Sequence, residues 1–479
     1  MTASPLEHPH TDKQWPLVLG ALSAILVFFL FTRPVVDADL WWHLRAGKDM
    51  WEQKHILLTD TFSYTRAGQS WVNAFWIAEL LFYLLYRIGG YILISGFVAF
   101  IGAITFYLVY RRLSGNPILN SFIIVLAALT AAPIWGPRPQ ILSFLFVALL
   151  DLWLSRKQPS WLMLPFFALW ANIHGGWIWG FLLLFAHIAG LIVQSFFTPQ
   201  DGILRRKEAL HLLGWTAGAA IAIGLNPNGF VLWHLPFQQV TVSMQIQEWL
   251  SPDFHRPDFH PILWMLFFLI LSGPFAKKPL DWPQIFKVLG FAYLTFVAQR
   301  NIALYAMTAA PLLSQWIGAA VESLQWKATR PERSLDARLK SSINAALIIL
   351  SSLAVLGNLF LTAQPARVDE NYPVAAVEWV RTNQPQGRMF NSYNWGGYLT
   401  WNLPSHEVFI DGRADLYGSD LLQQWHDVVN ANENAQEILA DWDVSWVFLE
   451  PNWPVVTLLR QNDWQVLYND ESAIILGRP

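Results

Sequence analysis

Long apolar runs recur along the chain from Trp15 to Thr362 and are the strongest constraint on its fold. Most approach the ~20 residues with which a helix crosses the hydrocarbon of a bilayer. Only 14% of the 479 residues are charged, against about 25% in soluble proteins. We therefore predict a polytopic α-helical membrane protein with about 11 spans, and with 13 as the alternative, at residues 15–35, 91–110, 118–135, 139–154, 160–173, 176–195, 209–225, 261–275, 283–298, 302–319 and 341–362.

Basic residues fall in alternate connections between these runs, and this sets the predicted orientation. Loops rich in Lys and Arg stay in the cytoplasm. We expect an integral protein of the cytoplasmic (inner) membrane, with the N-terminus (1–14) in the cytoplasm and the C-terminal region outside. The basic residues on the predicted cytoplasmic side are Arg111, Arg112, Arg156, Lys157, Arg205, Arg206, Lys207, Lys277, Lys278 and those from Lys327 to Lys340.

The stretch FWIAELLFYLLYRIGG, residues 75–90, decides whether this orientation is consistent. We predict an amphipathic helix that lies in the membrane interface, with Glu79 and Arg87 at its polar edge. The alternative is an ordinary span, which would reverse the side of every later loop. The run at 160–173 is short for a span, so one helical hairpin is also open to another interpretation.

The composition changes after Thr362, where short β-rich runs alternate with helical patterns. The β-rich runs are MFNS, EVFIDG, VSWVFLE, WQVLYN and AIILG. This alternation is typical of an α/β domain. The predicted domains are the cytoplasmic N-terminus (1–14), a transmembrane domain (15–363) whose first outer loop with interfacial helices spans 36–90, and a small extracytoplasmic α/β domain (364–479).

Two exclusions follow from composition. The chain has no cysteine, which excludes disulfides, thiolate metal ligands and cysteine nucleophiles. It has no basic stripe of the kind that binds nucleic acid. The net charge of −3 indicates no particular partner.

Two acids, Asp37 and Asp39, stand directly after the first apolar run and are followed by Trp41 and Trp42. Tryptophans anchor a segment at the depth of the lipid headgroups. Carboxylates held there can bind a divalent cation through oxygen, or take a proton from an attacking hydroxyl or amide. The alternative is a pair of solvated loop acids.

Other polar residues lie in the same set of predicted outer loops. Glu248 is a further oxygen ligand or a surface acid, and His174 stands beside two glycines that permit close approach. Arg300 lies between two spans, where a buried cation usually has a partner or a task. A guanidinium pairs well with phosphate. Arg138, in GPRPQ, is a weaker candidate of the same kind because its prolines already account for a tight turn.

Several of these segments together resemble a known family. The first outer loop of the oligosaccharyltransferase catalytic subunit is similar to DADLWWHLRAG followed by LLTDTFSYTRAGQSW. The family's loop that carries a glutamate near the metal is similar to SMQIQEW. The family's late segment that carries an arginine near the donor's phosphates is similar to AQRNIALYAMTAAP. The segment NSYNWGGYLTWNLPSHEVFIDGR stands where the family carries WWDYG. The resemblance assigns Asp39 to the principal metal-binding acid, Asp37 to its companion, His43 and Arg45 to the trailing pair, and Glu248, Arg300, Trp395, Gly397 and Tyr398 to the later motifs.

Two departures from the family pattern make the resemblance less specific to this one family. No second acidic pair appears in a later outer loop, where His174 is the nearest candidate, and Asn394 precedes Trp395 without the acid of WWDYG. Because that motif recognises the peptide acceptor, glycosylation of an asparagine sequon is not implied. The resemblance is therefore to the broader superfamily of C-type membrane glycosyltransferases, which use sugars linked to polyprenyl phosphate.

The resemblance implies transfer of a sugar from a polyprenyl-phosphate-linked donor to a lipid, glycan or protein acceptor at the extracytoplasmic face. A divalent metal, Mn²⁺ or Mg²⁺, is compatible with it. A non-catalytic scaffold derived from such an enzyme is the first alternative. A lipid-linked sugar transporter or flippase is the second, although the predicted spans carry almost no acids and show no repeat. The implied site comprises Asp37, Asp39 and Arg300 as catalytic residues, His43, Arg45, Arg138, His174, Trp395 and Tyr398 as substrate-binding residues, and Asp39 and Glu248 as metal ligands.

Overall fold

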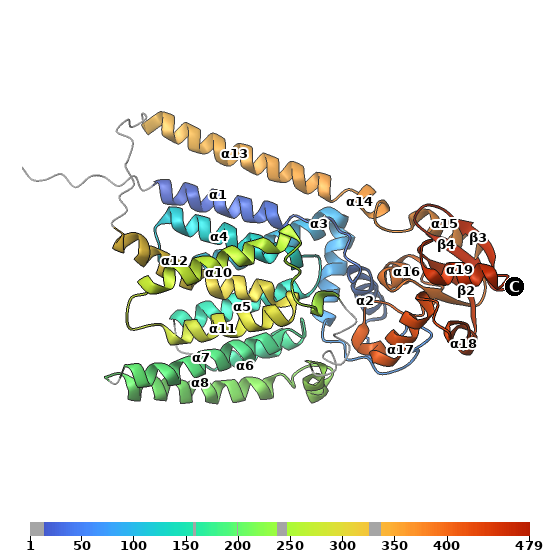
Figure 1. Cartoon of the computed structure of the whole chain (residues 1–479), viewed down its shortest axis with the longest axis horizontal. Helices are drawn as coiled ribbons and strands as arrows, with labels where there is room; N and C mark the ends of the chain where they lie inside the picture. The colour runs from blue at the N-terminus through green and yellow to red at the C-terminus, as the bar shows by residue number, and fades with distance from the viewer. Residues whose placement is uncertain (1–13, 157–159, 199, 237–246, 325–336) are drawn as a thin grey trace, which may run out of the picture.

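Every predicted apolar run forms a helix in the computed structural model, which describes residues 14–156, 160–198, 200–236, 247–324 and 337–479. These helices run side by side in one bundle (Figure 1). They are α1 (Gln14–Phe31), α3 (Trp76–Tyr110), α4 (Pro117–Ala131), α5 (Gln140–Arg156), α6 (Met163–Ala171), α7 (Trp177–Phe197), α8 (Gly202–Ala222), α10 (His260–Ser272), α11 (Trp282–Val297), α12 (Ile302–Ser323) and α13 (Ala337–Thr362).

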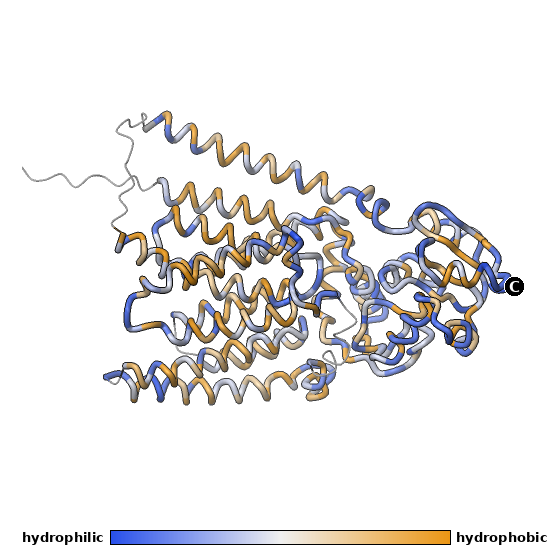
Figure 2. The backbone as a smooth tube through the Cα atoms, in the orientation of Figure 1, coloured by the Kyte–Doolittle hydropathy of each residue, from blue (hydrophilic) through white to orange (hydrophobic). Residues whose placement is uncertain are grey.

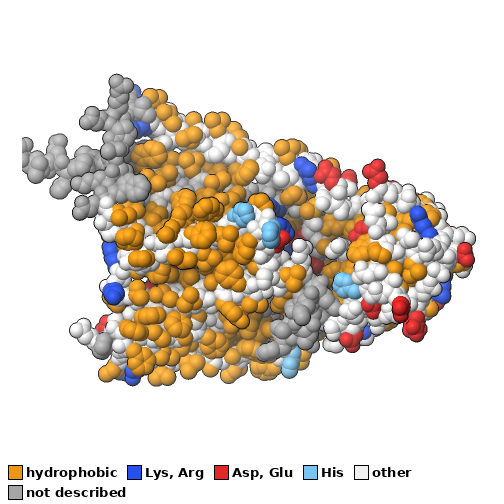
Figure 3. Space-filling model, in the orientation of Figure 1, with side chains coloured by type: hydrophobic (Ala, Val, Ile, Leu, Met, Phe, Trp, Pro, Cys, Tyr) orange, Lys and Arg blue, Asp and Glu red, His pale blue; other side chains and the backbone are white. Residues whose placement is uncertain are grey.

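The flank of the bundle is apolar, as Figures 2 and 3 show. Six helices in the described residues are long and apolar enough to cross a membrane, and α1 is a shorter apolar helix. Large apolar side chains such as Ile270 and Leu350 are 70% and 64% exposed. A surface of this kind is stable in lipid and costly in water. The chain is an integral membrane protein, while the number of crossings stays a prediction, because α6 has only 9 residues.

The predicted charge segregation corresponds to the two ends of this bundle. Arg111 follows α3, Arg156 ends α5, Arg205 and Arg206 begin α8, and Lys277 lies between α10 and α11. All of these helix ends lie at the end opposite the C-terminal domain (Figure 1). We call this the basic end and the other the site end. Which end faces the cytoplasm stays a prediction. Most of the predicted cytoplasmic N-terminus (1–13), Lys157 and the first part of the basic segment from Lys327 to Lys340 lie outside the described residues.

The disputed stretch 75–90 forms the first part of α3. Its helix is interrupted at Gly89 and Gly90, where Gly90 has a φ of 57° that a glycine adopts without strain. The part before this break runs across the site end of the bundle instead of along it (Figure 1), as an interfacial helix would. Arg87 is exposed as predicted. The prediction for Glu79 is wrong, because this side chain is fully buried between His43 and Asn73.

Helix α2 (Leu40–Gln53) packs between this part of α3 and the C-terminal domain. Gly47 permits the close crossing, because a Cβ there would overlap the backbone carbonyl of Glu79. Leu40, Trp41 and Leu44 are fully buried in the contact. The two aspartates that precede α2 are therefore held on a rigid support at the site end.

The C-terminal region is an α/β domain with one four-stranded sheet in the order β1-β2-β4-β3. The β1–β2 pair is parallel and the other two pairs are antiparallel, with Met389 opposite Trp446 and Phe448 opposite Ile475. The elements are α14 (Ala366–Asp369), α15 (Val374–Asn383), β1 (Arg388–Asn391), η8 (Tyr393–Trp395), α16 (Gly396–Asn402), α17 (Ala414–Val429), α18 (Ala435–Asp441), β2 (Val444–Leu449), α19 (Pro454–Gln461), β3 (Gln465–Asn469) and β4 (Ile474–Gly477).

One predicted strand is absent. EVFIDG forms no strand, because the side chain of Asn391 accepts from the amide of Phe409 at 2.8 Å and donates to the carbonyl of Ile410 at 2.8 Å. This side chain takes the place of a ladder of backbone hydrogen bonds. The segment instead leads to Arg413, which is 1% exposed and pairs with Asp60 of the first outer loop and with Asp411, each at 2.7 Å. The pairing ties the C-terminal domain to the first outer loop at the site end.

Candidate functional site

The two aspartates between α1 and α2 form a compact turn. Asp37 Oδ1 accepts from the backbone amide of Asp39 at 3.0 Å, and the indole of Trp42 donates to Asp39 Oδ1 at 3.2 Å. Short acidic side chains favour such local bonds with the backbone. Asp37 and Asp39 side chains are 14% and 22% exposed, so both carboxylates are largely withdrawn from solvent.

Arg138 lies between these carboxylates and a third one. Its Nε donates to Asp37 Oδ2 at 2.6 Å, and its Nη1 lies 3.2 Å from Asp39 Oδ2 and 2.8 Å from Glu248 Oε2. The connection from η1 (Ala132–Ile134) to α5 places it there, with a proline on either side that limits the backbone. The weakest arginine candidate in the sequence thus contacts all three acids.

Arg300 approaches Glu248 from the opposite side. Its Nη1 lies 3.5 Å from Glu248 Oε1, and its guanidinium stacks 4.3 Å from the Trp249 ring centroid. The short helices η4 (Gln247–Trp249) and η7 (Gln299–Asn301) are joined by a 2.9 Å bond from the Gln299 amide to the Leu250 carbonyl. Residues 243–246 of the predicted motif SMQIQEW lie outside the described residues.

Two buried histidines line the same space. His174 Nδ1 accepts from the backbone amide of Gly176 at 2.8 Å, so a proton on the neutral ring belongs on Nε2. Burial, and to a lesser extent the positive charge of Arg300, lowers the pKa of His174 to about 3. His43 contacts Glu79 through Nδ1 at 3.1 Å, and burial lowers its pKa well below the usual value. Both rings are therefore neutral hydrogen-bonding groups at neutral pH.

The acids at this site differ in their affinity for a proton. Burial raises the pKa of Asp39 to about 6, against the opposing effect of Arg138. Burial would also raise the pKa of Glu248, but Arg138 and Arg300 together lower it. Burial would lower the pKa of Arg138, yet Asp37, Asp39 and Glu248 raise it well above its usual value. Asp39 is thus the carboxylate best suited to accept a proton near neutral pH.

Three adjoining cavities contact Arg138. The smallest, of about 100 Å³, is lined by Asp39, His43, His174, Glu248 and Arg300. A second, of about 550 Å³, extends to the C-terminal domain, and a third, of about 670 Å³, extends toward the bundle helices. The second includes Tyr393, Asn394, Trp425, His426 and Trp453, and the third includes Arg33, Leu129, Pro257 and Pro261.

The side chains as they stand do not fit a divalent metal. Among the described residues, no group of three or more His, Asp or Glu is arranged to hold one. The space between the oxygens of Asp37, Asp39 and Glu248 is taken by the Arg138 guanidinium. Asp39 and Glu248 as metal ligands therefore remain a prediction, one that requires Arg138 to move.

The structure brings most predicted site residues together and places three elsewhere. Seven predicted site residues each line at least one of the three cavities: Asp37, Asp39, His43, Arg138, His174, Glu248 and Arg300. Arg45, Trp395 and Tyr398 line none of them. Arg45 binds Asp49 at 2.9 Å and the Thr400 carbonyl at 3.0 Å, and so joins α2 to α16. Trp395 packs on Phe448, and Tyr398 stacks on Tyr372.

Sequence reasoning missed several residues of the C-terminal domain. Tyr393 and Asn394 line the 550 Å³ cavity, two positions and one position before the predicted Trp395. Asp415 lines the 100 Å³ cavity, and burial raises its pKa to about 6. Gly412 lies so close to Asp39 that a Cβ there would overlap the Asp39 carboxylate. In the sequence, the signal for this close approach to Asp39 is the glycine of IDGR, Gly412.

Comparison with known proteins gives matches among solved structures alone. No protein-family model matches the sequence, and no curated protein matches it. The archaeal oligosaccharyltransferase AglB from Archaeoglobus fulgidus, in complex with an inhibitory peptide and a dolichol-phosphate, is similar with a TM-score of 0.57 and 13% identity over 92% of this chain and 70% of that one.

Two further structures are similar at lower scores. ArnT from Cupriavidus metallidurans, bound to undecaprenyl phosphate, has a TM-score of 0.47 and 13% identity over 97% of this chain and 98% of that one. The arabinofuranosyltransferase AftD from Mycobacteria has a TM-score of 0.46 and 11% identity over 97% of this chain and 40% of that one. The likeness to the oligosaccharyltransferase is one of fold. At the level of fold, the predicted resemblance to an oligosaccharyltransferase is confirmed.

Proposed function

We propose that this protein transfers a sugar from a polyprenyl-phosphate-linked donor to an acceptor at the site end of the bundle. The observation that carries this proposal is the convergence of Asp39, Arg138, His174, Glu248 and Arg300 on one small cavity. They come from five separate connections between helices, so no local structural need accounts for their meeting. The fold shared with a membrane glycosyltransferase supports the same conclusion.

The donor's long tail must remain in lipid, so its phosphate and sugar can be reached only where the bundle ends. The 670 Å³ cavity joins the bundle helices to Asp37 and Arg138, which suits a group that enters from the membrane. Arg138 lines this cavity and Arg300 lines the adjoining 100 Å³ one, and both guanidiniums can pair with the phosphate. As the bond from the sugar's anomeric carbon to the phosphate oxygen breaks, these guanidiniums offset the charge on the leaving phosphate.

Asp39 serves as the base in this proposal. The acceptor's hydroxyl or amide gives its proton to the Asp39 carboxylate as its oxygen or nitrogen bonds to the anomeric carbon. The electron pair of the broken bond leaves with the lipid phosphate. A pKa of about 6 keeps Asp39 ionised at neutral pH and still basic enough to accept that proton. Asp37 orients Asp39 through its backbone amide.

The acceptor enters from the C-terminal domain. The 550 Å³ cavity there is lined by Tyr393, Asn394, Trp425 and Trp453, and aromatic side chains of this kind bind flat or apolar surfaces. A lipid, a glycan and a protein all remain candidate acceptors. No step requires a metal ion, since the Arg138 guanidinium supplies the positive charge between the carboxylates.

One test separates an enzyme from a scaffold and a transporter. Purified protein in lipid nanodiscs is mixed with radiolabelled polyprenyl-linked sugars extracted from the native membrane, and free polyprenyl phosphate is measured. Transfer or hydrolysis of the sugar is expected, and it should be lost in Asp39→Asn. Binding of the lipid without release of polyprenyl phosphate would identify a scaffold. In sealed vesicles, movement of the intact lipid-linked sugar would identify a flippase.

A further inference from the structure

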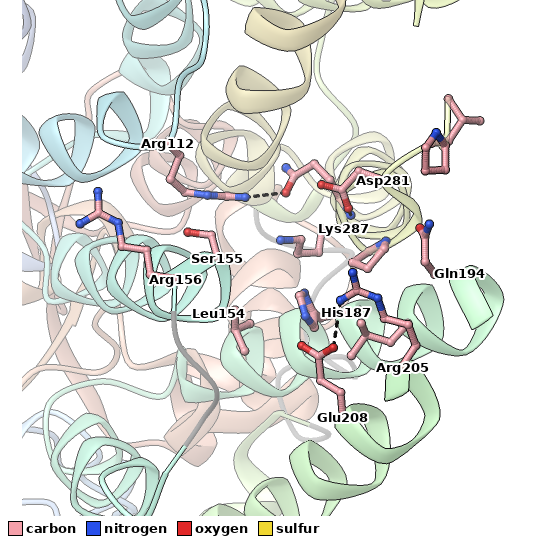
Figure 4. A pocket seen from close by; sticks show the side chains of 15 residues that line it. Arg112, Leu154, Ser155, Arg156, His187, Gln194, Arg205, Glu208, Asp281 and Lys287 are labelled. Atoms are coloured by element: carbon pink, nitrogen blue, oxygen red, sulfur yellow. Dashed lines mark hydrogen bonds and ion pairs between the residues drawn. The ribbon is translucent and has the colours of Figure 1, made fainter. Parts of the chain in front are cut away.

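A second pocket lies at the basic end of the bundle, at the other end from the candidate site. Figure 4 shows the side chains that line it. The pocket has a volume of about 510 Å³ and lies between the ends of α5 and α7 and the starts of α8 and α11. Charged side chains dominate its lining. They are Arg112, Arg156, His187, Arg205, Glu208, Asp281 and Lys287.

Two buried cations share one buried carboxylate at the back of this pocket. Lys287 Nζ donates to Asp151 Oδ1 at 2.7 Å, and Arg112 pairs with the other oxygen of the same group. The side chains of Lys287, Arg112 and Asp151 are 2%, 9% and 6% exposed. Two buried cations thus face one buried carboxylate, which leaves one buried positive charge in surplus.

Asp151 is also the one acid in the predicted spans. It lies near the end of α5 and not in mid-bundle, and this position weighs against a transport role.

The other charged groups at the pocket leave the net surplus at one positive charge. Glu208 is paired with Arg205 at 3.0 Å, and Asp281 Oδ1 caps α11 by accepting from the Gln284 amide at 3.1 Å. Counting Arg112, Arg156, Arg205 and Lys287 against Asp151, Glu208 and Asp281 leaves one positive charge. Buried charge without a counter-charge is strongly unfavourable.

Hydrogen-bonding groups at this pocket are also left without partners. In the described part of the chain, Arg112 Nε, His187 Nδ1 and Arg205 Nε are buried nitrogens with no hydrogen bond. His187 is 9% exposed, as is the Arg112 side chain. Figure 4 shows His187, Arg205 and Lys287 directed from three helices toward a common space. Buried polar groups almost always have partners, so their geometry calls for a ligand that accepts hydrogen bonds.

We propose that this pocket binds a phosphate group, carried by an anionic lipid headgroup or by a soluble phosphate compound. A phosphate supplies both the missing negative charge and several acceptor oxygens within a small volume. The helix α8 begins at the pocket, and the amino end of a helix favours anions. Basic pockets between helices at a membrane surface are suited to lipid headgroups. This site is independent of the proposed sugar transfer.

The test uses the purified full chain in neutral detergent at constant ionic strength. One arm compares the unfolding temperature in phosphatidylglycerol with that in phosphatidylcholine, and the other compares inorganic phosphate with chloride. A higher unfolding temperature with phosphatidylglycerol alone assigns the phosphate to a lipid headgroup. A rise in both arms shows that phosphate itself is sufficient. No rise in either arm would overturn the proposal.

Two neighbouring arginines provide a matched pair of variants. Arg205 lines the pocket, whereas Arg206 lies outside it and donates to Ser195 Oγ at 3.2 Å. Arg205→Gln should weaken binding by about tenfold, the effect of one charged hydrogen bond, while Arg206→Gln should bind like the wild type. Equal binding by both variants would contradict the assignment.

Lys287→Met tests the surplus charge itself. Asp151 keeps its Arg112 partner in this variant, so the buried charges become balanced. The unfolding temperature should then lose its response to phosphate and to anionic lipid. A response equal to that of the wild type would show that the buried surplus is not what binds the anion. If this variant does not fold, the arginine pair still decides the question.

Discussion

The two ends of the bundle carry opposite surpluses of buried charge. At the site end, the carboxylates of Asp37, Asp39 and Glu248 face two guanidiniums, Arg138 and Arg300. At the basic end, two cations face the single carboxylate of Asp151. The first arrangement leaves one negative charge and the second leaves one positive charge.

This difference indicates how each end can be neutralised. A surplus carboxylate can take a proton, and the raised pKa of Asp39, about 6, shows that tendency. At the basic end the surplus is a cation, since Arg112 and Lys287 share the single carboxylate of Asp151, and a bound anion supplies the missing negative charge. Proton transfer therefore belongs to the site end and anion binding to the basic end. The following predictions test this contrast, from the largest expected effect to the smallest.

Asp39→Asn should abolish the chemistry of the site end. Loss of a general base typically lowers a rate by about 10²- to 10⁴-fold, and sugar transfer in membranes with matched amounts of protein measures it. Asp253→Asn is the control, because Asp253 is 55% exposed and lines none of the three cavities. Full activity of Asp39→Asn would show that Asp39 is not the general base.

Arg138→Ala should remove the cation that separates the three carboxylates. Sugar transfer should fall by about 10²-fold or more, because a preorganised charge at the site is lost. The variant should also gain a binding site for Mn²⁺ or Mg²⁺, seen as a rise in unfolding temperature that the wild type lacks. If Mn²⁺ stabilises the wild type equally, the metal binds with Arg138 in place.

Gly412→Ala should push the C-terminal domain away from Asp39, because the new Cβ would overlap the Asp39 carboxylate. Small misplacements of catalytic groups cost about 10- to 10²-fold in rate. The control is Gly290→Ala in α11, where a Cβ meets nothing within 4 Å. Sugar-transfer rates of the two variants measure the effect. Equal rates would show that this contact does not position Asp39.

The raised pKa of Asp39 should also appear in the stability of the protein. Its pKa is about 6 in the folded chain, above the ordinary aspartate value of 3.8, so the folded state binds the proton more tightly than the unfolded state between these pH values. The unfolding free energy should therefore increase as the pH falls from 6 to 4, on the order of 1–3 kcal/mol. Asp39→Asn should lack this rise in unfolding free energy. The measurement is the unfolding free energy of the wild type and of the variant as a function of pH, and the difference between the two curves gives the contribution of Asp39. Parallel curves would refute the raised pKa.

The smallest effect is expected for Arg45→Ala. Because Arg45 joins α2 to α16 through Asp49 and Thr400, its loss should lower the unfolding free energy by about 1 kcal/mol. Turnover per folded molecule and the donor KM should stay unchanged. A raised KM at unchanged stability would restore the substrate-binding role that the sequence resemblance implied.

The helices could be predicted from the sequence because their signal is local. Every apolar run became a helix, and polar residues at the ends of these runs, such as Asp39, His174 and Arg300, meet at one site. A polar group placed where an apolar run ends marks the protein's surface in lipid, so this inference needs no knowledge of tertiary contacts.

The central place of Arg138 could not be predicted. Its partners Asp37 and Glu248 lie 101 and 110 residues away in the sequence, and nothing local indicates which acid it meets. The same limit applies to EVFIDG, whose strand-like pattern is overridden by the side chain of Asn391. Arg45, Trp395 and Tyr398 were assigned through the family resemblance. Here Arg45 and Tyr398 join α2 to the C-terminal domain, whereas Trp395 packs on Phe448 within that domain.

The most direct test of the account is the pH dependence of sugar transfer by the wild-type protein. If the Asp39 carboxylate is the base, kcat should be constant above pH 7 and fall about tenfold per pH unit below a pH near 6. A rate that stays level from pH 8 down to pH 5 would contradict a base with this pKa and with it the central claim.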